Sequence, residues 1–366
     1  MKKTKLFALI IAAILSTMVL FGCSAPNAAG SASQAAGVSQ SSSTSPLKDF
    51  AGTELSADKP ASKVMCIHPI FTMLALRLSS DKVVSVDKVY TTQYLSGKGQ
   101  DALLKNLNPD HIKTLPVTNT GVMSPLDPEQ VLSLNPDVIV TLDKDPNAAK
   151  LKDETKKTFV IVSKNTLQNY STSMRIMGVV LGNTTEANQM ADYWDKTITS
   201  ISSKTDPIAA KDRPNVYHCA SGSILATVGK DTIMASVVRI AGGNNLGDTI
   251  SDDSNGKNES ITVSMDQILK WNPDVVVANT SAQYQEIMNS PDWKSINAVK
   301  NGRVYCQLKY AQVDGLTTLP GLLWYNAILN AKSGTANLDS YYNEAPNFFK
   351  LFYKYDISKD ELNITR

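Results

Sequence analysis

The 366-residue sequence predicts an α/β protein of two Rossmann-like parallel-sheet lobes joined by a long α-helix. Three observations support this fold class. A helix–strand motif occurs twice, short runs of β-branched residues are typical of buried parallel strands, and a long stretch between the two motifs has helical spacing. A folded region of about 320 residues usually divides into two parts, because single hydrophobic cores rarely grow that large.

The repeated motif begins at Asp127 and again at Ser264. Its two copies read DPEQVLSLNPDVIV (127–140) and SMDQILKWNPDVVV (264–277). Each copy starts as a short helix and stops at Asn-Pro-Asp, because the residue before a proline is pushed out of the helical region. Each then continues into a β-branched strand. Two copies, 137 residues apart, predict the same structural unit in both lobes.

The other elements follow from the same kinds of pattern. Each lobe is predicted to open on a strand, at 63–68 and at 215–219, and the further strands are expected at 83–87, 159–163 and 303–307. Apolar residues keep helical spacing from 167 to 203, with a cap at 183–186 between two helical pieces. Helices that pack on the second lobe are predicted at 316–329 and 338–355.

The N-terminus has the pattern of an export signal. Lysines at positions 2, 3 and 5 precede an apolar run over 6–21, and Leu20-Phe21-Gly22-Cys23 closes it. This resembles a bacterial lipoprotein signal, which predicts a signal peptide over 1–22 and a lipid on Cys23. A single membrane-spanning anchor is the alternative, although the run is shorter than the ~20 residues needed to cross a bilayer. The resemblance predicts an exported chain, anchored by lipid to the outer face of the cytoplasmic membrane.

Composition sets the remaining boundaries. Residues 23–46 are mostly small and polar, which is typical of a flexible tether. We therefore expect an N-terminal lobe over 47–166, a linking helix over 167–205 and a C-terminal lobe with terminal helices over 206–366. A net charge of +2 provides no field that would favour nucleic acid. The cysteines beyond Cys23 lack the spacing of a disulfide scaffold or a structural zinc site, and their redox state stays open.

Taken together, these motifs resemble the helix-linked (class III) periplasmic binding proteins of ABC importers. The resemblance rests on the lipoprotein signal, the paired Asn-Pro-Asp blocks and the stretch ATVGKDTIMASVVRIAGGNN (226–245). It implies a ligand cleft between the lobes and a non-catalytic role, with no intrinsic cofactor. The implied function is capture of an iron chelate of the siderophore type. Haem, cobalamin or another corrinoid, and oxyanions such as molybdate or tungstate are the alternatives. The implied partners are the importer permease and its ATPase, with the protein itself a monomer.

The resemblance also implies where the permease binds. One acidic residue on each lobe is expected to contact arginines of the permease, and the matching residues are Glu129 and Asp266, at equivalent places in the repeat. The alternative is that both acids merely lie in the first turn of a helix, where the helix dipole favours negative charge.

The ligand contacts are expected on loops at the strand ends. By correspondence with the family, they are His68, Tyr90, Met123, His218, Cys219, Ser221 and Tyr310. His68 and His218 end the first strands of the two lobes, and imidazole is a suitable ligand for iron, copper or zinc. Direct metal binding by these histidines is one interpretation, and polar residues satisfied by backbone groups is the other. The identity of the ligand, its affinity and the extent of lobe closure remain open.

Two other classes of function are weighed against a binding protein. An extracytoplasmic enzyme is disfavoured because the sequence has neither a Gly-x-Ser-x-Gly elbow nor a His-Glu-x-x-His motif. A surface sensor or interaction protein built on the same scaffold is the second alternative.

Overall fold

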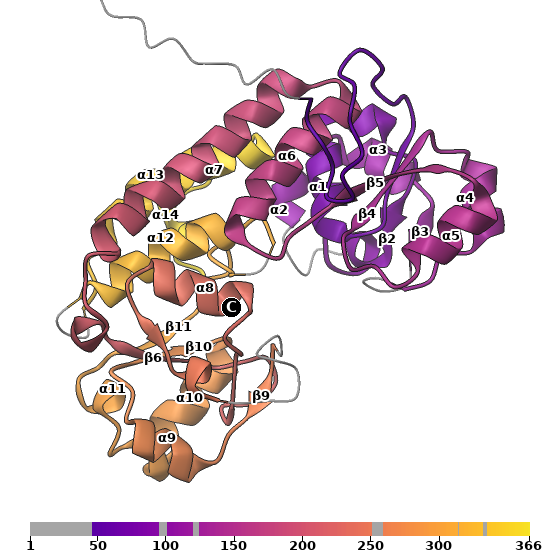
Figure 1. The fold of residues 1–366 in the computed structure, drawn as a ribbon. Helices are drawn as coiled ribbons and strands as arrows, with labels where there is room; N and C mark the ends of the chain where they lie inside the picture. Colours follow the sequence, from indigo (N-terminus) through magenta and orange to yellow (C-terminus); the bar gives the residue numbers. More distant parts are fainter. Residues whose placement is uncertain (1–45, 95–100, 120–123, 251–258, 314, 332–334) are drawn as a thin grey trace, which may run out of the picture. The chain divides into compact units, whose positions relative to one another are not determined.

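The structure is a computed structural model that describes residues 46–94, 101–119, 124–250, 259–313, 315–331 and 335–366. The predicted signal peptide, Cys23, nearly all of the predicted tether and Met123 lie outside these residues. Residues 46–366 form one compact unit, and the two parallel sheets within it come from different halves of the chain (Figure 1).

The N-terminal lobe is built on a parallel sheet with the strand order β1-β4-β5. Its strands are β1 (Val64–Cys66), β4 (Val138–Leu142) and β5 (Thr158–Val162). β2 (Val86–Asp87) and β3 (Val117–Asn119) form a second parallel pair. A bridge between Val83 and Val64 connects the chain just before β2 to β1. The helices of this lobe are α1 (Pro69–Ser79), η1 (Ser80–Lys82), η2 (Tyr90–Tyr94), α2 (Asp101–Leu104), α3 (Pro109–Thr114), α4 (Pro128–Leu134) and α5 (Ala148–Thr155).

The C-terminal lobe has a four-stranded parallel sheet with the order β11-β10-β6-β8. Its strands are β6 (Asn215–His218), β8 (Asn244–Asn245), β10 (Val275–Ala278) and β11 (Val304–Cys306), and an antiparallel pair, β7 (Ala226–Thr227) with β9 (Ile261–Thr262), lies beside them. The helices of this lobe are η3 (Ala210–Asp212), α8 (Ile233–Ile240), η4 (Leu246–Thr249), α9 (Met265–Trp271), α10 (Ser281–Asn289), η5 (Pro291–Trp293) and α11 (Asn297–Lys300). Two parallel-sheet lobes, as predicted, are therefore confirmed.

Helices cover both faces of each sheet, and alternate strand residues therefore pack into different cores. In the C-terminal lobe, Tyr217 and Val276 pack with residues of α9, α10 and α11. Their neighbours Val216 and Val275 pack with residues of α8 and α12 (Thr318–Leu329). The N-terminal lobe repeats this arrangement, with α4 and α5 on one face and α1 and α6 (Leu167–Leu181) on the other. Strands buried on both faces explain the β-branched runs in the sequence.

The repeated Asn-Pro-Asp connects each helix to its sheet in the same way. Asn135 and Asn272 cap α4 and α9 in the left-handed conformation, with φ of 48° and 45°. Asp137 then accepts hydrogen bonds from the N–H groups of Ser62 and Lys63 (2.8 and 2.9 Å). Asp274 accepts one from the N–H of Asn215 (2.9 Å), so in both lobes the aspartate binds the chain where the first strand begins.

The region between the lobes contains two helices, as the predicted cap at 183–186 implies. They are α6 and α7 (Thr184–Thr205), and Gly182 at φ 73° ends the first of them. The Asn183 side chain does not cap α7 by accepting a backbone N–H. Instead it donates to the Glu186 carboxylate and to the carbonyl of Leu78 (both 2.9 Å). The 22 residues of α7 span about 33 Å.

The two C-terminal helices differ in what they cover. α12 packs against α7 and α8, as expected of a helix on the second lobe. α13 (Asp339–Tyr353) also contacts the linking helix and the N-terminal lobe. Phe352 packs on Trp194 of α7, and the guanidinium of Arg77, from α1, donates to the carbonyl of Leu351 (2.6 Å). The short helix α14 (Lys359–Leu362) follows. No helix in the described ranges is both long and apolar enough to cross a bilayer.

We predict that removing the aspartate of either repeat destabilises its lobe. Asp137→Ala or Asp274→Ala leaves one or two strand N–H groups without an acceptor, and we expect a loss of about 1–3 kcal/mol in the free energy of unfolding. Urea denaturation measures this loss. The exposed Asp58 is a matched control, since Asp58→Ala should change stability by no more than ~0.5 kcal/mol. Equal stability of D274A and D58A would contradict the prediction.

Candidate ligand-binding site

The carboxyl ends of the parallel strands are where open α/β sheets bind ligands. In the N-terminal lobe, His68, Asp143 and Lys164 follow β1, β4 and β5. In the C-terminal lobe, His218 ends β6, while Asn279 and Gln307 follow β10 and β11. We refer to these two sets as the N-lobe edge and the C-lobe edge.

The His68 side chain is engaged in capping the helix that follows it. The side chain caps α1, with Nδ1 accepting a hydrogen bond from the N–H of Ile70 (3.3 Å). Burial, with a smaller contribution from the charge of Lys164, lowers the pKa of His68 to about 3. The imidazole is therefore neutral at neutral pH, and the proton is on Nε2 because Nδ1 is an acceptor. A metal bound at Nε2 would require the proton to move to Nδ1, which would break the cap.

Tyr90 also supports α1 from within the core. Its ring is fully buried, and its hydroxyl donates to the carbonyl of Pro69 (2.9 Å). Nearby, the Thr72 hydroxyl donates to the carboxylate of Asp87 (2.9 Å), which joins α1 to β2. At the N-lobe edge Asp143 is exposed and Lys164 is half-buried, and the neighbouring exposed Asn165 donates to the Asp143 carboxylate (2.6 Å).

His218 is held in the interior of the C-terminal lobe. Its Nδ1 contacts the Tyr325 hydroxyl, from α12, and its carbonyl accepts a hydrogen bond from Thr227 (2.9 Å). Burial, with a smaller contribution from the Arg366 charge, lowers the pKa of His218 to about 4. Burial raises the pKa of Tyr325, so the phenol keeps its proton and can donate to Nδ1. Like His68, this histidine is neutral and already partnered on Nδ1.

The cysteines next to the histidines are buried thiols. Burial raises the pKa of both Cys66 and Cys219 far above the ordinary value, with smaller contributions from Asp87 and Glu286 respectively. The thiolate, which is the form that binds metal, is therefore disfavoured at both positions. Cys219 also pairs with Thr227 in an antiparallel bridge, which gives it a packing role.

A polar network at the C-lobe edge contains a residue that the sequence analysis missed. The Arg366 guanidinium donates to Asn279 Oδ1 (2.8 Å), and Asn279 Nδ2 donates to the Ser221 hydroxyl (3.0 Å). Asn279 is itself held by Gln283, whose amide accepts from the Asn279 N–H and donates to the Ala220 carbonyl (2.8 and 2.9 Å). The structure thus connects the predicted residue Ser221 to a guanidinium 145 positions away in the sequence.

The backbone at Arg366 is fixed over the ends of two strands. Its N–H donates to the Gln307 carbonyl (2.9 Å), and its carbonyl accepts from the N–H and hydroxyl of Ser281 (2.7 and 2.8 Å). Gln307 is almost fully buried, and its Nε2 has no hydrogen-bond partner within the described part of the chain. A buried donor without an acceptor is rare in folded proteins.

Tyr310 lies against α13. Its ring is buried edge-on against Phe349 at 5.8 Å, with the Lys309 ammonium 5.1 Å from the ring centre. Among the described residues, no group of three or more His, Cys, Asp or Glu side chains is arranged to hold a metal.

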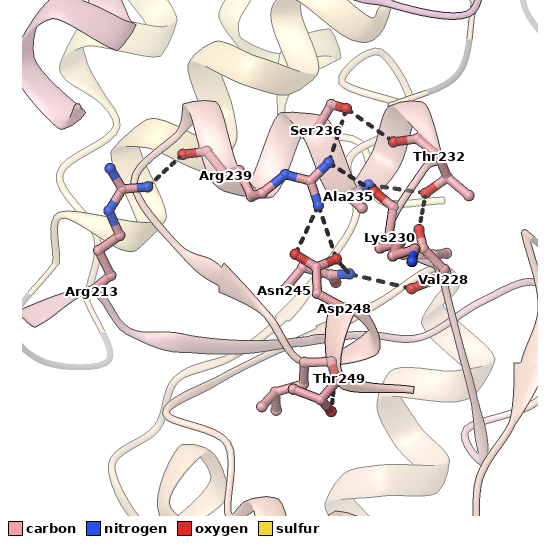
Figure 2. Close-up of polar contacts among 12 residues, drawn as sticks. Arg213, Val228, Lys230, Thr232, Ala235, Ser236, Arg239, Asn245, Asp248 and Thr249 are labelled. Carbon is pink, nitrogen blue, oxygen red and sulfur yellow. Dashed lines mark hydrogen bonds and ion pairs between the residues drawn. The ribbon is translucent and has the colours of Figure 1, made fainter. Parts of the chain in front are cut away.

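The 226–245 stretch supports the C-lobe edge through a network around Arg239. Arg239 donates to both carboxylate oxygens of Asp248 (2.9 and 2.8 Å; Figure 2). The Asn245 side chain donates to Asp248 (2.8 Å) and to the Val228 carbonyl (3.3 Å). Gly247 belongs to this turn because a Cβ there would lie 2.0 Å from the Val228 carbonyl oxygen. The network thus joins helix α8 to β8 and to the residue that follows β7.

The expected docking acids have equivalent positions in the two lobes. Glu129 and Asp266 are the second residues of α4 and α9, and both are exposed. Within the described residues, neither carboxylate takes part in an ion pair.

Comparisons with known proteins identify the family. The family model for periplasmic binding proteins matches residues 69–308. The chain belongs to the periplasmic binding protein family. This membership makes it a substrate-binding protein and confirms the resemblance seen in the sequence.

Individual relatives are distant in sequence and similar in fold. The uncharacterized ABC transporter substrate-binding lipoprotein YvrC of Bacillus subtilis is 23% identical over 266 residues, covering 71% of this chain and 76% of its own. An ABC transporter solute-binding protein of Sulfurospirillum deleyianum has a TM-score of 0.72 at 19% identity, covering 87% of this chain and 97% of its own. The molybdate-bound MolA of Haemophilus influenzae has a TM-score of 0.66 at 16% identity, covering 86% and 99%.

The two buried histidines predict how stability depends on pH. An unfolded histidine has a pKa near 6.5, and in the folded chain these pKa values are about 3 and about 4. The unfolded state therefore binds protons first, so this stabilisation is complete above pH ~6.5 and is lost as the pH falls towards 4. His218 alone should cost about 2 kcal/mol between pH 7 and pH 5.

Urea denaturation over this pH range provides the measurement. The His218→Asn variant should take up about one proton fewer on unfolding than the wild type near pH 5. The imidazole signals of His68 and His218 should show no titration above pH 5 by NMR. Titration of either ring near pH 6.5 would contradict the burial that the structure shows.

Proposed function

We propose that this protein is the cargo-binding lipoprotein of an ABC importer, and that it captures an iron chelate of the siderophore type. The observation that carries the chelate assignment is the C-lobe edge. The exposed Arg366 guanidinium, held by Asn279, and the exposed hydroxyl of Ser221 form a set of hydrogen-bonding groups around one positive charge. Such a set suits the anionic oxygens of catecholate or carboxylate chelates.

In this proposal the metal arrives inside its chelate and is not bound directly by the protein. Both histidines are neutral, are partnered on Nδ1 and are nearly buried. Direct ligation at His68 would disrupt the α1 cap, and a metal at His218 would have to enter the interior of the C-terminal lobe. The buried predicted residues then support the strand ends from the interior of each lobe; they are His68, Tyr90, His218, Cys219 and Tyr310. Ser221 is the predicted residue that is exposed to solvent among those described.

An oxyanion such as molybdate is the second candidate, and the same edge favours it. A guanidinium and a hydroxyl are also groups that bind a small tetrahedral dianion. The Haemophilus relative of similar fold was solved with molybdate bound. Both candidates share anionic oxygen chemistry, and a ligand panel separates them.

The location proposed for the protein follows from its N-terminus. Cys23 would carry the lipid, 23–46 would form the tether, and the lobes would work as a monomer at the outer face of the cytoplasmic membrane. The lipoprotein in the name of the Bacillus relative supports this proposal. Glu129 and Asp266 would meet cationic residues of the permease, which works with its ATPase.

Neutralising Arg366 should weaken binding of anionic cargo. The probes are a ferric tris-catecholate and molybdate as anions, cationic ferrioxamine B, and the alternatives haemin and cyanocobalamin. They are titrated into residues 24–366 while tryptophan fluorescence is recorded. We expect Arg366→Gln to raise the Kd of the anion that binds by about tenfold or more, because a charge-assisted hydrogen bond is lost.

Arg175 provides the matched control. It pairs with Asp192 and Asp195 on the surface of α6 and α7, so Arg175→Gln should leave the Kd unchanged. Selective binding of ferrioxamine B or cyanocobalamin would contradict the anionic cargo. Absence of saturable binding by every probe would reject the binding function itself.

Reversing the docking acids should separate transport from binding. The double variant Glu129→Lys with Asp266→Lys should bind its cargo like the wild type, because both side chains are exposed on α4 and α9. Uptake of the radiolabelled cargo by cells should fall close to background, since two like-charge contacts would face the permease. Wild-type uptake by this variant would show that these acids do not dock.

A further inference from the structure

We infer that each lobe contacts the permease through an acid and a leucine together, Glu129 with Leu132 and Asp266 with Leu269. The inference rests on the docking role proposed above and adds an apolar component to it. We call the two sets the α4 patch and the α9 patch.

The leucines are exposed although their helices already have buried residues. The side chain of Val131 on α4 and that of Ile268 on α9 are fully buried and anchor each helix to its lobe. Leu132 and Leu269, the next residues, are 46% and 40% exposed. The core therefore does not account for a leucine at either position.

The two leucines occupy the same position of the repeat. Each lies three residues after the docking acid, so acid and leucine share one face of a helical turn. The position after the leucine differs, with Ser133 in one lobe and Lys270 in the other. Two lobes with different strand ends thus present an acid and a leucine at equivalent positions, with glutamate in one lobe and aspartate in the other.

A second exposed hydrophobic residue lies beside the α4 patch. Val117 is 38% exposed, and its carbonyl accepts a hydrogen bond from Gln130 of α4 (3.3 Å). This bond brings the start of β3 beside the docking helix. The α4 patch is therefore the larger apolar surface, and the α9 patch has Lys270 at its border.

Physical considerations require an apolar partner beside each acid. A solvent-exposed ion pair contributes little affinity, and its main effects are on orientation and on the rate of encounter. Side chains that become fully desolvated supply most of the binding energy of an interface. Two acids alone would guide the protein to the permease without holding it there, and the leucines supply the missing contact.

Charge decides the occupant of these patches. Both patches are negative, so contact between two copies of this chain through them would bring like charges together. A partner with a cationic side chain next to an apolar socket, present twice, complements both patches. The importer permease proposed above is the partner with that chemistry.

Photo-crosslinking in the protein's own host identifies what touches the patches. A photoreactive residue is placed at 129, 132, 266 or 269 of the full chain. Met288 is the matched control, because it is 37% exposed on α10 and is not part of either patch. We expect positions 132 and 269 to capture one integral membrane protein that copurifies with an ATP-hydrolysing subunit. Position 288 should not capture it.

The captured permease and ATPase, placed in lipid nanodiscs, then allow a quantitative test. The concentration of binding protein that gives half-maximal ATPase stimulation should rise about tenfold for Leu132→Ala or Leu269→Ala, and about 100-fold for the double variant. Met288→Ala should leave it unchanged. Binding of the anionic probe should be the same in all four variants.

The outcomes separate the inference from the proposed function. Unchanged stimulation by the leucine double variant would overturn the inference, as would crosslinks at 132 and 269 to a second copy of the chain, to a soluble protein or to nothing. If the Glu129→Lys and Asp266→Lys variant stimulates normally, the docking role itself fails. Loss of probe binding in the wild type would instead reject the binding function.

Discussion

The hydrogen bonds of Asp137 and Asp274 determine how each lobe is assembled. Each aspartate lies between a capped helix and a central strand, and it holds the start of the first strand of its sheet. The asparagine, in the left-handed conformation, and the proline that follows it stop the helix. The aspartate after the proline therefore leads directly into the central strand. Donation from two backbone N–H groups also lowers the pKa of Asp137, which keeps this carboxylate ionised.

The strand ends differ between the lobes although their assembly is the same. Each first strand ends in a neutral histidine, but His68 caps a helix whereas His218 meets a tyrosine from α12. The cation of the N-lobe edge is Lys164, a point charge, and that of the C-lobe edge is Arg366, which can donate to two oxygens at once. In the proposed function, directional recognition of anionic oxygens is therefore assigned to the C-lobe edge.

The sequence predicted the parts of the fold that depend on local rules. The repeat, the strands and the two helices at 167–205 follow from apolar periodicity and from the effect of proline, and the structure has them near the predicted residues. The role of Arg366 could not be predicted, because its position depends on a backbone bridge between Leu308 and Thr365. The burial of Cys219 and Tyr310 likewise depends on helices distant in sequence. Correspondence with the family alone indicated a ligand contact in both cases.

One continuous apolar core explains how two lobes can present matched outer surfaces. Buried residues of α1, α6, α7, α8, α12 and α13 belong to a single cluster, so the inner faces of both sheets share one support. The outer faces, which carry α4 and α9, have separate small cores of their own. α4 and α9 are therefore anchored by cores of their own, outside the cluster that joins the two sheets. A partner that binds the acid and the leucine of each lobe would contact two surfaces that are supported in the same way.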